Sequence, residues 1–399
     1  MRVSSKSIQM QWLAVLSQQQ TNVARLQQQI GSGLRVSKAS DDPVGAAQIT
    51  LFQQGLDRLQ SYAKNGDTAE RRLRLEESSL DQATDVLTRA RELAVQAGGA
   101  AAAAPEARQA IANEVRELFT SLVDVGNAQD GEGRYLFAGN KVQTKPFESI
   151  AGAVLYAGDQ GARSQRISDD RLIQENDSGA AVFNAIRNGN GVYSVSAANS
   201  NQGEMSYTSA SLVDPASWSP GNYTISFTSE DRYDLLDGAG TTLTSNNAYT
   251  PGSLIAFNGA VIDFEGVPAA GDEFSVRSSR NQSAFNTLQN FVSTLESTIN
   301  APADRALYQN RLNNSLMDLD QSLNHINEVR SDVGARLNAI DGQRSVNDEV
   351  GFQLETSLSS VRDLDYASAI ADLQLRLLSL ETAQKSFART QQSSLFDFI

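Results

Sequence analysis

The sequence has no cysteine and only one histidine among its 399 residues. Without cysteine the chain has no disulfide, no thiolate nucleophile and no zinc site of the cysteine type. The single histidine, His325, lies one position off an apolar helical stripe, which favours an ordinary exposed helix residue over a catalytic base. These absences argue against an enzyme, and we predict no catalytic, metal or cofactor site.

Long apolar runs are also missing. No stretch of about 18 apolar residues occurs, so the sequence predicts no membrane insertion. Glutamines interrupt the apolar positions between Gln9 and Gln29, and the zones of a secretory signal peptide are not found. A net charge of -14 argues against nucleic acid as a partner, because duplex binding needs basic residues that neutralise phosphates.

The first 40 residues lack acidic side chains altogether. Such an acid-poor, amphipathic start is also found in mitochondrial transit peptides. Its regular apolar period favours a retained helix that packs on a partner. The basic residues of this segment are Arg2, Lys6, Arg25, Arg35 and Lys38.

Both ends of the chain carry a narrow stripe with alternating steps of four and three residues, the spacing of a coiled-coil seam. We expect these stripes to be assembly surfaces, with the glutamines constraining register. The N-terminal stripe comprises Trp12, Leu16, Gln19, Val23, Leu26 and Ile30. The C-terminal stripe comprises Tyr366, Ile370, Leu373, Leu377, Leu380, Gln384, Phe387 and Gln391.

Four further stripes of the same period predict helices inside these ends. No proline follows Pro302, so the fourth stripe predicts one helix from about residue 303 to 360. The stripes are Gly66, Ala69, Leu73, Glu76, Leu80, Ala83, Leu87, Ala90 and Ala94; Ile111, Val115, Leu118, Leu122 and Val125; Phe285, Leu288, Val292, Leu295 and Ile299; and Leu312, Leu316, Leu319, Leu323, Ile326, Arg330, Val333, Leu337 and Ile340.

Between about 141 and 280 the pattern changes to strands. Tyr223, Ile225 and Phe227 alternate with polar residues and share one face. Asn258-Gly259 separates two β-rich runs and predicts a hairpin turn. We therefore predict a mainly α fold with an inserted β domain.

The stretch GSGLRVSKASDDPVGAAQ, residues 31–48, places two aspartates before a proline. Asp42 before Pro43 has the form of a helix N-cap followed by proline at the first helical position. We interpret the pair as a helix start and not as a metal or acid/base site, because no histidine or further acid lies nearby.

The residues also carry a resemblance. QQQIGSGLRVSKASDDPVGAAQ is similar to the N-terminal signature of the bacterial flagellin superfamily, in the form of its hook-associated members. GRYLFAGNKVQTKPF (133–147), VGARLNAID (333–341), SSVRDLDYASAIADLQ (359–374) and the final SSLFDFI resemble the same proteins.

The resemblance implies a long coiled-coil-like helical bundle built from both termini. It assigns 1–42 and 364–399 to terminal assembly helices, 43–140 and 281–363 to a helical bundle domain, and 141–280 to a β-rich outer domain. The expected assembly residues are Trp12, Leu16, Val23, Leu26, Ile30, Ile370, Leu373, Leu377, Leu380 and Phe387.

The same resemblance implies a structural role at the hook–filament junction of the extracellular flagellum. Its expected partners are copies of itself in a ring, the adjacent hook-side junction protein, flagellin, and an export chaperone on the C-terminal helix. Export would be unfolded, through the flagellar type III system, without a cleaved signal peptide. A flagellin filament subunit and a surface adhesin with a coiled-coil stalk are the alternatives.

Overall fold

The computed structural model describes residues 5–100, 104–150 and 152–392. The final SSLFDFI and the side chain of Gln391 lie outside the described part of the chain. Two compact units result from the packing: Met1–Lys64 with Gly342–Ile399, and Asn65–Asp341.

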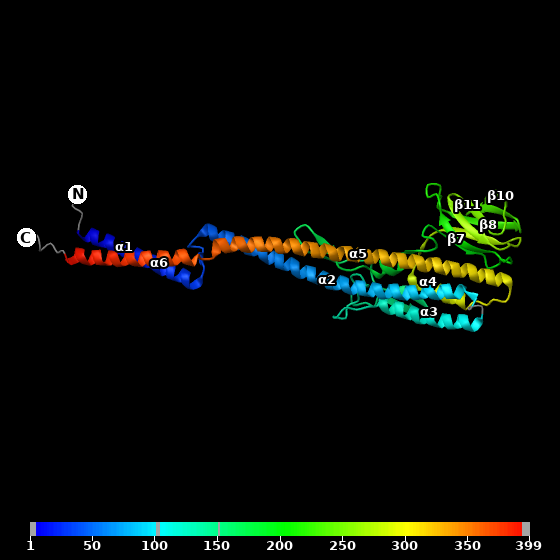
Figure 1. Cartoon of the computed structure of the whole chain (residues 1–399), viewed down its shortest axis with the longest axis horizontal. Coiled ribbons are helices and arrows are strands. Elements are labelled where there is room, and N and C mark those ends of the chain that lie inside the picture. The colour runs from blue at the N-terminus through cyan, green and yellow to red at the C-terminus, as the bar shows by residue number, and fades with distance from the viewer. Residues whose placement is uncertain (1–4, 101–103, 151, 393–399) are drawn as a thin grey trace, which may run out of the picture. The chain divides into compact units, whose positions relative to one another are not determined.

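Helices occupy both ends of the chain and strands its middle (Figure 1), which confirms the predicted mainly α fold with a β-rich insertion. None of the described helices is long and apolar enough to cross a membrane. The helices are α1 (Ser5–Ser32), α2 (Pro43–Gly98), α3 (Pro105–Gly126), α4 (Ala284–Leu295), α5 (Pro302–Arg362) and α6 (Tyr366–Gln392).

The second unit contains the helical core. All nine residues of the predicted stripe from Gly66 to Ala94 are buried on α2. On α5, Leu312, Leu319, Ile326 and Val333 have no exposed surface. The four-and-three spacing therefore identified the buried faces correctly.

One stripe ends sooner than predicted. We expected the α4 stripe to continue to Ile299, but α4 ends at Leu295. The N–H of Glu296 bonds back to the carbonyl oxygens of Val292 and Thr294 and closes the helix. The chain must then turn to begin α5 at Pro302, whose ring suits a first helical turn.

The first strands of the β-rich region belong to the helical core. Phe147, Phe183 and Phe285 of α4 form a triangle of rings with centroids 4.9–5.6 Å apart. The short strands in this part of the chain pair as β1–β2, β3–β4 and β5–β14. They are β1 (Phe147–Ile150), β2 (Ala153–Tyr156), β3 (Ser164–Arg166), β4 (Leu172–Gln174), a short π-helical turn (Ala180–Asn184), β5 (Ile186–Arg187) and β14 (Asn281–Gln282).

The remaining strands form two antiparallel sheets around a separate core, called here the β sandwich. One sheet has the order β10-β9-β8-β13-β6 and the other β11-β12-β7. Phe264 and Phe274, one from each sheet, meet with ring centroids 4.9 Å apart. The strands are β6 (Tyr193–Ala197), β7 (Ser206–Leu212), β8 (Asn222–Ser229), β9 (Arg232–Asp237), β10 (Thr242–Ala248), β11 (Leu254–Phe257), β12 (Ala260–Glu265) and β13 (Glu273–Ser278).

Two details of the β sandwich confirm the sequence pattern. Tyr223, Ile225 and Phe227 are buried together on one face of β8. Asn258 and Gly259 connect β11 to β12 with φ values of 46° and 78°, as a two-residue hairpin turn of type I′ requires.

Amide side chains on α5 hold the β sandwich. The side chain of Asn310, which is 2% exposed, accepts from the Tyr207 N–H at 2.9 Å and donates to Met205 O at 3.1 Å. Asn313 donates to Tyr207 O at 2.6 Å. These bonds satisfy the backbone where β7 meets the helix, so the contact does not leave buried polar groups unpaired.

The chain enters and leaves the β sandwich at one place, called here the neck. The backbone N–H of Asn188 donates to Arg280 O at 3.1 Å, and the Arg280 N–H donates to Asn188 Oδ1 at 2.8 Å. Ser279 Oγ donates to Asn188 O at 2.7 Å. The two crossing segments are therefore fastened to each other.

A buried carboxyl group interrupts the apolar face of α2. Glu76 is 2% exposed, and its Oε1 accepts from the Asp177 N–H at 3.1 Å. Burial, reinforced by the Asp177 carboxylate, holds the pKa of Glu76 well above its usual 4.5. Arg336 forms its ion pair at 2.7 Å with Asp177 and opposes this shift only in part.

The raised pKa of Glu76 predicts how the stability of the fold depends on pH. A carboxyl group whose pKa rises on folding retains a proton that the unfolded chain releases, so its contribution to stability falls as the pH rises above about 4.5. Glu76→Gln should therefore raise the midpoint of thermal unfolding at pH 7 and have a smaller effect at pH 4. Exposed Glu117→Gln is the control and should change neither. An equal gain at both pH values would contradict the assignment.

Candidate assembly face of the terminal helices

Helices α1 and α6 lie side by side and run in opposite directions (Figure 1). On α1, Val23 is 7% exposed, and the other apolar residues of the predicted stripe are half-buried. On α6, Leu373, Leu380 and Phe387 are half-buried. The structure thus brings the predicted α1 stripe together with these three residues of the α6 stripe within one chain.

The less exposed residues of α6 form a row along the helix. This row shares only every second residue with the predicted stripe. Ile370 and Leu377 are 45% and 43% exposed and flank the row. The predicted stripe missed Ala369, Arg376 and Ala383, because two small side chains and a charged one carry little hydrophobic signal. The row consists of Ala369, Leu373, Arg376, Leu380, Ala383 and Phe387.

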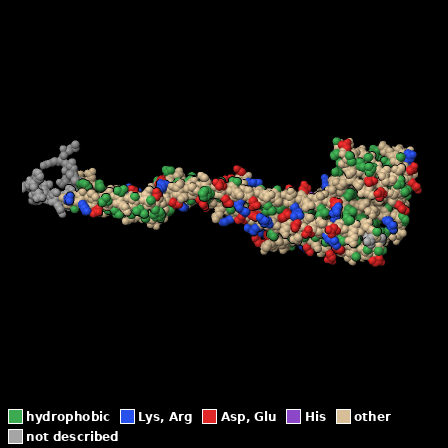
Figure 2. Space-filling model, viewed as in Figure 1, with side chains coloured by type: hydrophobic (Ala, Val, Ile, Leu, Met, Phe, Trp, Pro, Cys, Tyr) green, Lys and Arg blue, Asp and Glu red, His purple; other side chains and the backbone are tan. Residues whose placement is uncertain are grey.

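Pairing of α1 with α6 leaves much apolar surface uncovered, and Figure 2 shows hydrophobic side chains along these helices. We call these the outer apolar residues. They are Met10, Leu13 and Val15 on α1, which are 59%, 51% and 44% exposed, and Ile370, Leu375, Leu377 and Leu378 on α6, which are 45%, 62%, 43% and 61% exposed.

A polar side chain interrupts the seam on α1. Gln19 is half-buried, and its Oε1 is buried without a hydrogen-bond partner among the described residues. An unsatisfied buried acceptor costs about 1–3 kcal/mol. The α1–α6 pair is therefore weaker than its apolar residues alone would make it.

The bend after α1 is joined to the bend before α6 by a short backbone ladder, called here the terminal bridge. Leu364 N–H donates to Gly33 O at 2.9 Å, and Arg35 N–H donates to Arg362 O at 2.7 Å. The Arg35 guanidinium adds bonds of 3.0 and 2.6 Å to Val361 O. These bonds fix the point from which α1 and α6 extend together.

Glycine is required in the terminal bridge. Gly33 has φ of +71°, and a Cβ there would lie 2.9 Å from the Tyr366 hydroxyl oxygen. Neither the bridge nor the role of Arg35 followed from the sequence, because the bonds join segments more than 320 residues apart.

Aspartates cap the helices that leave the two bends. Asp42 Oδ1 accepts from the Gly45 N–H at 2.9 Å, and α2 begins at Pro43. Asp365 Oδ1 accepts from Ala367 N–H at 3.0 Å, just before α6. Hydrogen bonds from Ser368 hold the pKa of Asp365 below its usual range, so this cap is charged at neutral pH.

The described residues include no group of three or more acidic or histidine side chains placed to hold a metal ion. His325 lies on α5, and its Nε2 is 2.8 Å from Ala181 O. The features described on the terminal helices are packing surfaces and helix caps.

The model of the bacterial flagellin N-terminal helical region matches residues 3–142. The crystal structure of FlgL from Xanthomonas campestris is 32% identical, with a TM-score of 0.72, and the match covers 77% of this chain and 99% of that one. The chain belongs to the FlgL family, also called flagellar hook-associated protein 3.

Other members of the FlgL family show the same likeness. The flagellar junction protein FlgL of Legionella pneumophila is 31% identical with a TM-score of 0.72, over 79% of this chain and 99% of that one. Flagellar hook-associated protein 3 of Salmonella typhimurium is 31% identical over 186 residues, which are 47% of this chain and 58% of that protein. These relatives are structural flagellar proteins, and this FlgL family member is not an enzyme, as predicted.

A matched pair of glycines tests the terminal bridge. Gly33→Ala should destabilise the bends by about 1–2 kcal/mol, because a side chain in the left-handed region is strained and this one also meets Tyr366. Gly31→Ala is the control, since nothing lies within 4 Å of a Cβ there. Amide hydrogen exchange should become faster in α1 and α6 for Gly33→Ala alone. Equal exchange in both variants would rule out this role for Gly33.

Proposed function

We propose that this protein is a structural adaptor between hook and filament in the bacterial flagellum and that it assembles through α1 and α6. The observation that carries the proposal is the set of outer apolar residues that remains after α1 and α6 have paired. Exposed apolar side chains gathered on one pair of helices support a protein interaction site there.

Geometry supports assembly by copies of the same helices. A two-helix pair covers one side of each helix, whereas the outer apolar residues extend beyond that side. Covering one Leu or Ile side chain contributes roughly 1.5–3 kcal/mol. Several such residues per copy are enough to order neighbouring α1–α6 pairs into a ring.

The finer assignments belong to the same proposal. Residues 1–42 and 364–399 are the assembly helices, 43–140 and 281–363 the helical bundle domain, and 141–280 the outer β-rich domain. The partners are copies of this chain, the adjacent hook-side junction protein and flagellin. Before assembly a flagellar export chaperone covers the C-terminal helix, and the unfolded chain leaves through the type III channel.

The two faces of α6 give a sharp test. Leu377→Asp places a charge among the outer apolar residues, so it should abolish filament attachment while leaving the α1–α6 pair intact. Leu380→Asp alters a half-buried residue of the row and should also loosen that pair. The control is Ser379→Asp, at an exposed polar position two residues from Leu377.

Filament attachment is scored by electron microscopy of cells that carry each variant, and the α1–α6 pair by hydrogen exchange of the purified chain. Attached filaments in the Leu377→Asp strain would show that the outer apolar residues are not the assembly face. Loss of filaments in the Ser379→Asp strain would show that any added charge on α6 is disruptive.

Deletion of the gene separates the junction role from the alternatives. Intact hooks with flagellin released into the medium are expected for a junction protein. Absence of flagellin both on the cells and in the medium would identify the chain as the filament subunit. Filaments that remain attached would contradict the junction role and leave a surface adhesin as the alternative.

A further inference from the structure

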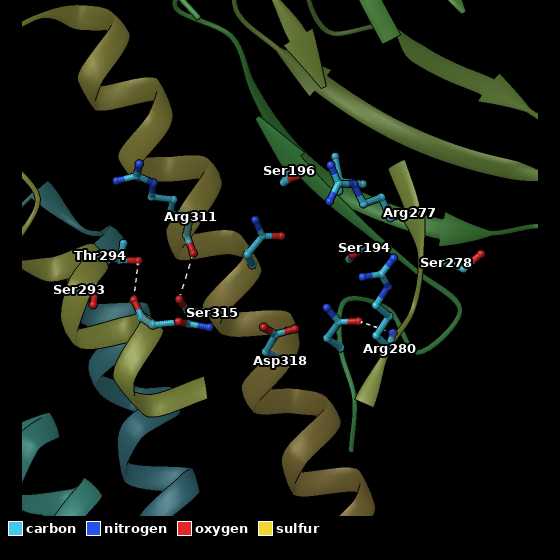
Figure 3. A pocket seen from close by; sticks show the side chains of 14 residues that line it. Ser194, Ser196, Arg277, Ser278, Arg280, Ser293, Thr294, Arg311, Ser315 and Asp318 are labelled. Carbon is cyan, nitrogen blue, oxygen red and sulfur yellow. Dashed lines mark hydrogen bonds between the residues drawn. The ribbon is translucent and has the colours of Figure 1, made fainter. Parts of the chain in front are cut away.

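A cavity of about 630 Å³ lies between the β sandwich, the neck, α4 and α5. Figure 3 shows Arg277 and Arg280 on the sandwich and neck side and Ser315 and Asp318 of α5 on the other. The volume is within the range of about 300–1,000 Å³ that is usual for small-ligand sites. Its walls come from separate elements that the bonds of the neck and of α5 hold in place.

The cavity concentrates positive charge in an acidic protein. Arg277, Arg280 and Arg311 line it, although the chain has a net charge of -14. Within the described part of the chain none of the three forms an ion pair; Arg311 donates to the amide oxygen of Asn199 at 2.9 Å. Unpaired guanidinium groups with their fork of donors are suited to carboxylate, sulfate or phosphate oxygens.

The single carboxylate in the wall does not neutralise the arginines. Asp318 Oδ1 accepts from the Gly189 N–H at 2.7 Å, and its Oδ2 accepts from Gln282 Nε2 at 2.8 Å. Burial raises the pKa of Asp318, and both of its oxygens are engaged by these donors and not by the arginines. Asp318 therefore has a structural task in holding the neck to α5.

The rest of the lining consists almost entirely of polar side chains that can form hydrogen bonds. Of the residues around the cavity only Val195 is apolar, and none is aromatic. Ser194 and Ser196 alternate with inward-facing residues along β6, and Ser194 lies opposite Arg277 on β13. Their hydroxyl groups have no hydrogen-bond partner among the described residues. Such a surface suits a ligand with several hydroxyl groups.

We infer that this cavity binds an anionic, hydroxyl-rich ligand of the acidic saccharide class, with Arg277 and Arg280 on the acid group and the β6 serines on hydroxyl groups. A nucleotide base would find no ring on which to stack, and an apolar peptide side chain would find only Val195. The inference does not depend on the proposed junction role.

The test is calorimetric titration of the purified full-length chain with glucuronate, glucose and inorganic phosphate at low salt. Glucuronate should bind saturably and more tightly than either of the other two. Arg277→Gln and Arg280→Gln should each weaken glucuronate binding about tenfold or more, because each removes a charge-assisted hydrogen bond. Both side chains are exposed, so thermal unfolding should be unchanged.

The matched control is Arg171→Gln, which removes one positive charge from an exposed position outside the cavity and should leave binding intact. Ser196→Ala should weaken glucuronate more than phosphate. The inference is overturned if glucuronate shows no saturable binding or if the cavity variants bind like Arg171→Gln. Phosphate that binds as tightly as glucuronate would overturn the assignment to saccharides.

Discussion

The structure depends on one constraint: a helix with apolar residues only at every third or fourth position must cover a narrow stripe against another helix. Helices α2 and α5 meet this constraint inside the second unit, where their stripes are buried along with the apolar faces of α3 and α4. Helices α1 and α6 meet it only in part. Val23 and Ala369 are buried between them, while leucines and an isoleucine remain outside. The same spacing of apolar residues thus gives a fully covered core in the second unit and an only partly covered one between α1 and α6.

The sequence predicted those features that depend on local spacing. The buried face of α2 from Gly66 to Ala94, the long helix α5 and the hairpin at Asn258-Gly259 each follow from a period or a turn preference that acts over a few residues. Asp42 and Pro43 belong to the same group, because a cap and its helix are neighbours along the chain. The predicted apolar stripe on α1 also lies on the less exposed side of that helix.

The features that escaped prediction join distant segments or involve residues with weak hydrophobic signals. The bonds of Arg35 to Val361 could not be inferred from either segment alone. On α6, Ala369, Arg376 and Ala383 lie on the less exposed side, which shifted the row away from the larger Ile370 and Leu377. The cavity beside α5 depends on how the β sandwich is fastened, so its arginines, widely separated in sequence, gave no sign of a common site. Within the predicted insert, Phe147 and Phe183 proved to be part of the helical core.

The neck has a consequence for how such a protein can change over time. The β sandwich is connected through two adjacent segments, and its apolar core is separate from the helical one. A module whose two ends lie close together can be exchanged, enlarged or trimmed without altering the register of the flanking helices. The β sandwich is therefore free to diversify at its own rate, while the helices that carry the heptad stripes are held to a fixed geometry by the apolar faces that they bury.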